Sequence, residues 1–220
     1  MIEAVLIPLK DTLHVISSGL LIPTITILLL LLALTAVELG GLLTETLTER
    51  RKMKVNVPEL VDSFQGKNVG EILAMIERSS LFRRQKTALG ELIMRNSLPT
   101  ATLQALARRL LAGEELHYAR ITDRTDLVAR LAPMFGLMGT LIPLGPGMIA
   151  LGQGDIKILA DSLLIAFDTT VAGLAAAGVA FAISRLRKRW YDDYLSTLEA
   201  LMESLLEVFE RGRGTEKPAA

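Results

Sequence analysis

Three long stretches almost without charged side chains constrain this chain more than any other feature. They run from Val15 to Val37, from Leu131 to Gly154 and from Ser162 to Ser184, and the last contains one acidic residue, Asp168. A helix of about 20 apolar residues crosses the hydrocarbon core of a bilayer. The chain is therefore predicted to be an all-α, polytopic membrane protein with three transmembrane helices.

The first stretch could instead be a signal peptide. Its apolar part is longer than the roughly 7 to 15 residues of such a segment. In addition, Glu38, Leu39 and Gly40 form no small-x-small cleavage pattern. A membrane helix is the preferred interpretation.

Composition and charge exclude several classes of function. The 24 basic and 24 acidic residues balance, so no cationic excess points to a nucleic-acid partner. Without cysteine the chain has no disulfide, thiolate nucleophile or cysteine-based zinc site. The two histidines lie far apart in the sequence: His14 is expected at a membrane interface and His117 on a helix face. We therefore expect no metal site, and we expect no cofactor.

Sequence motifs for enzymatic chemistry are also missing. The stretch from Gly145 to Ala150 is rich in glycine but follows no strand and lies inside an apolar span, so it is not a dinucleotide loop. No GxxxxGK[ST] phosphate-binding loop occurs, and no serine is expected to have a histidine base near it in a pocket. We expect a protein that is not an enzyme.

Basic residues near the span ends predict the orientation, because lysine and arginine collect on the cytoplasmic side. They follow the first span, precede the second and follow the third, so these three flanks are expected to be cytoplasmic. The N-terminus and the connection from Gly152 to Asp161 are then expected outside. The basic residues are Arg50, Arg51, Lys52, Lys54, Arg120, Arg124, Arg130, Arg185, Arg187, Lys188 and Arg189.

These features divide the chain into five segments. Residues 1–39 hold the outer N-terminus and the first span, and residues 40–126 form a cytoplasmic helical insert and stalk. Residues 127–156 and 157–184 hold the second and third spans, and residues 185–220 form a cytoplasmic amphipathic helix and tail.

Helical periodicity continues on both sides of the paired spans. Pro58 and Pro99 are each placed to open a helix. A face from Leu103 to Ile121 predicts one helix that runs without a break into the second span. After the third span a heptad seam is expected to pack on other helices and to end at Gly212 and Gly214; it consists of Tyr191, Leu195, Leu198, Met202, Leu205 and Phe209.

Small or polar residues form one stripe on each of the last two spans. Small side chains allow helices to approach closely in lipid, which explains either stripe alone. A lone three-helix unit would expose both stripes to lipid, so the pair predicts a homo-oligomer. The stripes are Pro133, Gly136, Thr140, Pro143 and Gly147, and Ala166, Thr170, Gly173, Ala177, Ala180 and Ser184.

The same two spans resemble a known family. The run from Leu131 to Thr140, LAPMFGLMGT, is similar to the APxxGLLGT motif of the MotA/TolQ/ExbB proton-channel family. The run from Thr169 to Leu174, TTVAGL, is similar to that family's TTxxGL motif in its last span. The order, separation and placement of both motifs agree with the family, and so does the layout of the whole chain.

This resemblance implies a pentamer in the cytoplasmic membrane whose second and third spans line a pore. Single-span partner helices of the ExbD/TolR/MotB type lie inside it, and protons or sodium ions pass along an aspartate of the partner. Thr140 and Thr170 carry over as the pore-lining threonines. The other expected pore-lining residues, from the same stripes, are Pro133, Gly136, Gly173 and Ala177.

The sequence departs from the family pattern in the pore region. Several relatives have a glutamate five residues before the second threonine, where this chain has Ile165. Asp168 stands where those relatives are apolar, and the segment from Pro143 to Gly147 is richer in helix breakers.

Asp168 has two interpretations. It is either a structural carboxyl group, hydrogen-bonded to Thr24 and Thr26 at a similar depth, or an ion or proton relay between subunits. Of these, the structural interpretation is preferred.

Three functions remain open at this stage. The leading one is a subunit that converts an ion-motive force into motion together with a partner. The alternatives are a stand-alone oligomeric ion channel or permease, and a membrane scaffold without ion flux.

Overall fold

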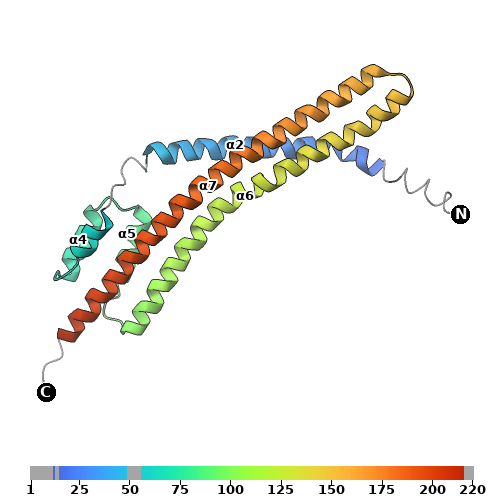
Figure 1. The fold of residues 1–220 in the computed structure, drawn as a ribbon. Helices are drawn as coiled ribbons and strands as arrows, with labels where there is room; N and C mark the ends of the chain where they lie inside the picture. The colour runs from blue at the N-terminus through green and yellow to red at the C-terminus, as the bar shows by residue number, and fades with distance from the viewer. Residues whose placement is uncertain (1–11, 13–14, 49–55, 216–220) are drawn as a thin grey trace. The chain divides into compact units, whose positions relative to one another are not determined.

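The structure, a computed structural model, describes residue 12 and residues 15–48 and 56–215, and they are almost entirely helical (Figure 1). The described residues contain no strand, so the all-α prediction is confirmed. His14 and the basic residues at 50–54 lie outside the described residues. The principal helices are α2 (Leu21–Thr48), α3 (Val57–Asp62), α4 (Val69–Arg78), α5 (Arg83–Met94), α6 (Thr100–Gly152) and α7 (Ile156–Thr215).

The chain divides into two compact units. Met1–Leu42 and Asp123–Arg185 form one, here called the apolar unit. Leu43–Thr122 and Leu186–Ala220 form the other, the polar unit. The helices α2, α6 and α7 each contribute residues to both units.

Three helices are long and apolar enough to cross a membrane, as the sequence predicts: Val15–Leu47, Thr100–Gly152 and Ile156–Arg213. In the apolar unit α2 buries one stripe, formed by Thr24, Leu28, Leu31 and Thr35. Leu31 packs in a cluster with Val128, Ala132, Ala176, Ala177 and Ala180 of α6 and α7. Large side chains such as Leu29, Leu30 and Phe167 are exposed, which is typical of helices that contact lipid.

The helix α6 runs unbroken from Thr100 to Gly152, so the prediction that one helix continues into the second span is confirmed. It begins directly after Pro99, as expected. Pro133, Pro143 and Pro146 lie inside it and do not end it. Because proline has no N–H, each removes one backbone hydrogen bond from the helix.

A tight turn joins α6 to α7. Gly154 lies in this turn with a φ of +81°, a left-handed conformation that favours glycine. Asp155 then caps the start of α7, because its Oδ1 accepts a hydrogen bond from the N–H of Ile158 at 3.1 Å. The turn brings α6 and α7 together as an antiparallel pair (Figure 1).

The polar unit has its own apolar core. Its buried residues come from α4, α5, α6 and α7, from the turn that follows α3 and from the loop between α4 and α5. The predicted heptad seam of α7 contributes to it, so the seam packs within its own chain. The expectation that Gly212 and Gly214 end this helix is wrong, since α7 continues to Thr215. The core includes Phe64, Ile72, Ile76, Leu89, Leu92, Leu103, Leu198, Leu201, Met202, Leu205 and Phe209.

Buried polar groups tie the helices of the polar unit together. Arg187 of α7 is 5% exposed, and its Nε lies 3.4 Å from a carboxylate oxygen of Glu45 of α2. Tyr191 stacks on Tyr118 of α6 with ring centroids 4.5 Å apart. Burial, followed by the negative charge of Glu45, raises the pKa of Tyr191, so this phenol stays neutral over the physiological pH range.

Gln85 has the most demanding position in this core. Its side chain is 2% exposed; Nε2 donates to the carbonyl of Tyr194 at 3.0 Å, and Oε1 accepts from the N–H of Phe82 at 3.1 Å.

Replacing Gln85 with leucine is expected to destabilise this core. Leucine has a similar volume, but it leaves the carbonyl of Tyr194 and the N–H of Phe82 without the hydrogen bonds that Gln85 provides. We expect a loss of about 1–3 kcal/mol in the free energy of unfolding, measured by denaturation in mild detergent. Thr87→Val, at an exposed position of α5, serves as the control, and equal stability of both variants would contradict the prediction.

Candidate ion pathway

Glycines bring the backbones of α6 and α7 into close contact in the apolar unit. A Cβ atom added at Gly173 would lie 2.7 Å from the carbonyl oxygen of Ala132 and 2.9 Å from the Cα of Gly136. A Cβ at Gly136 would lie 3.2 Å from the carbonyl oxygen of Thr169. Because the neighbouring atoms belong to backbone, Gly173 has no room for a side chain, and a side chain at Gly136 would require the two helices to move apart by a few tenths of an ångström.

Two further glycines accommodate hydroxyl-bearing side chains of α7. A Cβ at Gly139 would lie 2.7 Å from the Cβ of Thr169, and one at Gly147 would lie 2.9 Å from the Cβ of Ser162. The close contact therefore extends along the pair from Gly136 to Gly147 on α6.

Much of the two predicted stripes is thus buried within one chain. Gly136 and Gly147 of the first stripe face α7, and Ala166, Gly173, Ala177 and Ala180 of the second are buried. A lone unit therefore does not expose most of these small residues to lipid, contrary to the expectation from the sequence, because they pack on one another inside the hairpin. Helix pairs in lipid favour such close backbone contact.

Thr140 and Thr170 lie beside this contact and are half-buried. The hydroxyl of Thr140 donates to the carbonyl of Leu137 at 2.6 Å, and that of Thr170 donates to the carbonyl of Ala166 at 3.0 Å. Each hydroxyl proton is thus directed to the threonine's own helix. The lone pairs of the oxygen remain as acceptor groups.

The other four predicted pore-lining residues occupy two kinds of position. Pro133 is half-buried on α6. Gly136 and Gly173 face each other in the backbone contact, and Ala177 belongs to the buried cluster that includes Leu31. In the single chain these three therefore serve the packing of the hairpin.

Asp168 lies on the exposed face of α7. The structural interpretation placed its carboxyl group on Thr24 and Thr26, and that pairing is wrong. Thr24 is 1% exposed, and the Thr26 hydroxyl donates to the carbonyl of Ile22 at 2.8 Å. Within the part of the chain that the structure describes, Asp168 has no hydrogen-bond or ionic partner.

The apolar unit contains a further polar contact that was not predicted from the sequence. The hydroxyl of Ser184, which is 2% exposed, donates to Oδ1 of Asp126 and joins α7 to α6. Thr169 was noted only as part of a motif, and its packing role was not predicted: it is 7% exposed and fills the space opposite Gly139. The available signals for Thr169 were the small residue Gly139 in the first motif and the adjacent threonines 169 and 170 in the second. Nothing in the spacing of Asp126 and Ser184 indicates their contact.

The described residues contain no group of three or more histidine, cysteine or acidic side chains that could hold a metal ion.

All of α6 and most of α7 lie within a region that matches a known protein family. Residues 78–200 match the MotA/TolQ/ExbB proton channel family, which is more than half of the chain. The chain belongs to the MotA/TolQ/ExbB proton channel family. The resemblance carried by the two span motifs is thereby confirmed. The matched region contains Thr140, Thr170 and Asp168, and the family is one of channels, not of enzymes.

A search among curated proteins finds no match. Family membership and three apolar helices identify the chain as a membrane protein of a channel family.

Proposed function

We propose that this protein is the pore-forming subunit of a complex in the cytoplasmic membrane that is driven by an ion-motive force. It acts as a homo-oligomer, a pentamer in the family pattern, with a single-span partner of the ExbD/TolR/MotB type. The single observation that carries this proposal is the family match over both motif-bearing helices. The close contact between α6 and α7 also supports the proposal. In the proposed complex these two helices surround a partner helix that moves, so they need to stay firmly packed on each other.

The threonines provide suitable chemistry for such a pore. Because the hydroxyl protons of Thr140 and Thr170 are directed to backbone carbonyls, both threonines would present mainly acceptor oxygens to the interior of the pore. An acceptor oxygen can take a hydrogen bond from a protonated carboxyl group of the partner or from a hydronium ion, and can bind sodium directly. Pro133, Gly136, Gly173 and Ala177 would form the wall behind these oxygens.

Ion flux and partner dependence test this proposal together. The protein is purified in mild detergent, its mass is measured by native mass spectrometry, and proton flux is followed in liposomes with and without the co-purifying partner. We expect an oligomer, a partner with one transmembrane span, and flux only when both are present. A stable monomer would contradict the oligomer, and flux from this chain alone would favour a stand-alone channel.

Orientation is tested by labelling single cysteines, since the chain contains none. Gln153 lies in the α6–α7 turn and is exposed, and it avoids the positive φ of Gly154. We expect an impermeant thiol reagent to label Gln153→Cys from the outside and Glu77→Cys, on α4, only after the membrane is opened. The reverse result would overturn the proposed topology, with the N-terminus outside and the C-terminus in the cytoplasm.

Asp168 is proposed as an ion or proton relay between subunits. A carboxyl group exposed to lipid is costly, so we expect another chain to cover it in the complex. Asp168→Asn keeps size and hydrogen bonding but does not titrate. Loss of ion-coupled activity with normal oligomer mass is the expected result, and normal activity would assign Asp168 a structural role.

A further inference from the structure

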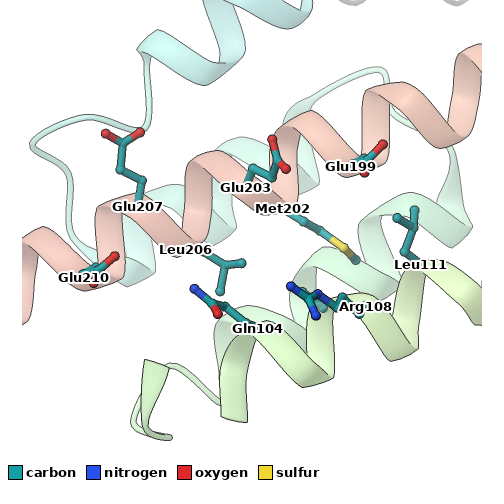
Figure 2. Close-up of a pocket in the computed structure, with 10 residues that line it drawn as sticks. Gln104, Arg108, Leu111, Glu199, Met202, Glu203, Leu206, Glu207 and Glu210 are labelled. Atoms are coloured by element: carbon teal, nitrogen blue, oxygen red, sulfur yellow. The ribbon is translucent and has the colours of Figure 1, made fainter. Parts of the chain in front are cut away.

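A groove runs between α6 and α7 in the polar unit and has a volume of about 370 Å³. Its floor is apolar and is formed by Ala107, Leu111, Met202 and Leu206. Figure 2 shows Gln104 and Arg108 on the α6 side and a row of carboxylates along α7. These carboxylates belong to Glu199, Glu203, Glu207 and Glu210.

Most carboxylates of this row form no ion pair among the described residues, and Arg108 of α6 is the cation that lines the groove beside them. Glu207 pairs with Arg211 at the next helical turn. Glu199, Glu203 and Glu210 form no ion pair among the described residues. Like charges four residues apart destabilise a helix, so a cation from a second molecule would stabilise this row.

A complementary surface lies on another face of α6. Ala105, Arg109, Ala112 and Leu116 follow one another at spacings of four, three and four residues, so they share one face of the helix. Leu116 is 55% exposed, and Arg109 is exposed without an ionic partner among the described residues. This face combines a cation, small residues that allow close approach, and an apolar side chain.

The two surfaces lie at the same level of the antiparallel pair. Tyr118 stacks on Tyr191, which fixes the register of α6 against α7. Arg109 lies nine residues before Tyr118 on α6, and Ala200 lies nine residues after Tyr191 on the antiparallel helix α7. Arg109 is therefore level with Ala200 and with its neighbour Glu199. In a ring whose axis runs along the helix pair, Arg109 of one copy therefore lies level with the acidic row of the next.

We propose that the groove of one copy receives the α6 face around Arg109 of a second copy. The contact places Arg109 between Glu199 and Glu203, and Ala105 and Ala112 allow the backbones to approach. Because the two surfaces differ, the contact is head-to-tail and closes a ring when the rotation is suitable. The inference rests on the oligomer of the proposed function and names the surfaces that hold its polar units together.

Disulfide cross-linking tests the contact directly. Arg109→Cys and Glu203→Cys are placed in separate chains with different tags, expressed together and oxidised in native membranes. We expect a cross-linked dimer that carries both tags, which a bond within one chain does not produce. The control pair replaces Arg109→Cys with Glu77→Cys, on exposed α4, and should form no such dimer.

Charge reversal provides the second measurement. Arg109→Glu is expected to lower the yield of oligomer by about tenfold in native mass spectrometry. The double variant Arg109→Glu and Glu203→Arg should restore it. An oligomer of normal mass without the two-tag cross-link would overturn this contact and leave the proposed function standing. A monomer of the unmodified protein would overturn both. A cross-link from Glu203→Cys to a different protein alone would also overturn the contact, because the occupant is then a partner.

Discussion

Replacing Gly173 with alanine is expected to disrupt the apolar unit and abolish ion-coupled activity. The new Cβ would lie 2.7 Å from the carbonyl oxygen of Ala132 and 2.9 Å from the Cα of Gly136. Because both neighbours are backbone atoms, α6 and α7 must separate. We expect a loss of about 1–3 kcal/mol in stability, measured by thermal denaturation in detergent, together with loss of ion flux in liposomes.

Gly178 offers a matched control on the same helix. A Cβ atom added there meets no atom within 4 Å, so Gly178→Ala makes the same chemical change without a clash. Alanine also favours a helix over glycine by up to about 1 kcal/mol, so this variant should equal or exceed the parent in stability. A Gly173→Ala protein as stable and active as Gly178→Ala would show that the contact is not required.

Removing the hydroxyl of Thr170 or Thr140 is the second change with a large expected effect. Valine has nearly the same shape as threonine and cannot accept a hydrogen bond. A hydrogen bond to a charged group contributes about 1.5–3 kcal/mol, so we expect ion-coupled activity to fall by roughly tenfold to a hundredfold. Flux is measured in liposomes with the partner present, and oligomer mass should not change.

Two controls separate the role of the oxygen from that of the side-chain shape. Thr170→Ser and Thr140→Ser keep the hydroxyl and should retain most activity. Thr26→Val removes a hydroxyl that also donates to its own helix, but on α2 at an exposed position, and should leave flux unchanged. Full activity of both Thr170→Val and Thr140→Val would remove these residues from the pathway.

Much of the helical architecture could be predicted because it depends on local patterns. The uncharged lengths of the three stretches require helices in a bilayer, since only a helix satisfies its own backbone there. Pro99 marked the start of α6, and the heptad seam marked the buried side of α7. The end of α7 was missed at Gly212 and Gly214, because glycine weakens a helix without ending one that is held by other contacts.

The candidate site could be predicted only in part. The two motifs indicated which helices carry it and drew attention to Thr140 and Thr170. They did not show that Gly136 and Gly173 face each other, or that Thr169 fills the space opposite Gly139. A stripe of small residues has the same spacing whether it faces another helix, a pore or a second copy of the chain. What the stripe packs against depends on how the helix is rotated about its own axis, and spacing does not record that rotation.

The sequence by itself determined the all-helical fold, the three apolar spans and the family, because these depend on composition and on spacing along one helix. Only the tertiary structure decided which stripes are buried within the hairpin and that Gln85 and the Asp126–Ser184 pair link distant helices. It also decided that Asp168 has no partner among the residues that the structure describes. These features depend on the rotation and register of one helix against another. Rotation and register are set by the summed packing of many side chains, and no local pattern records them.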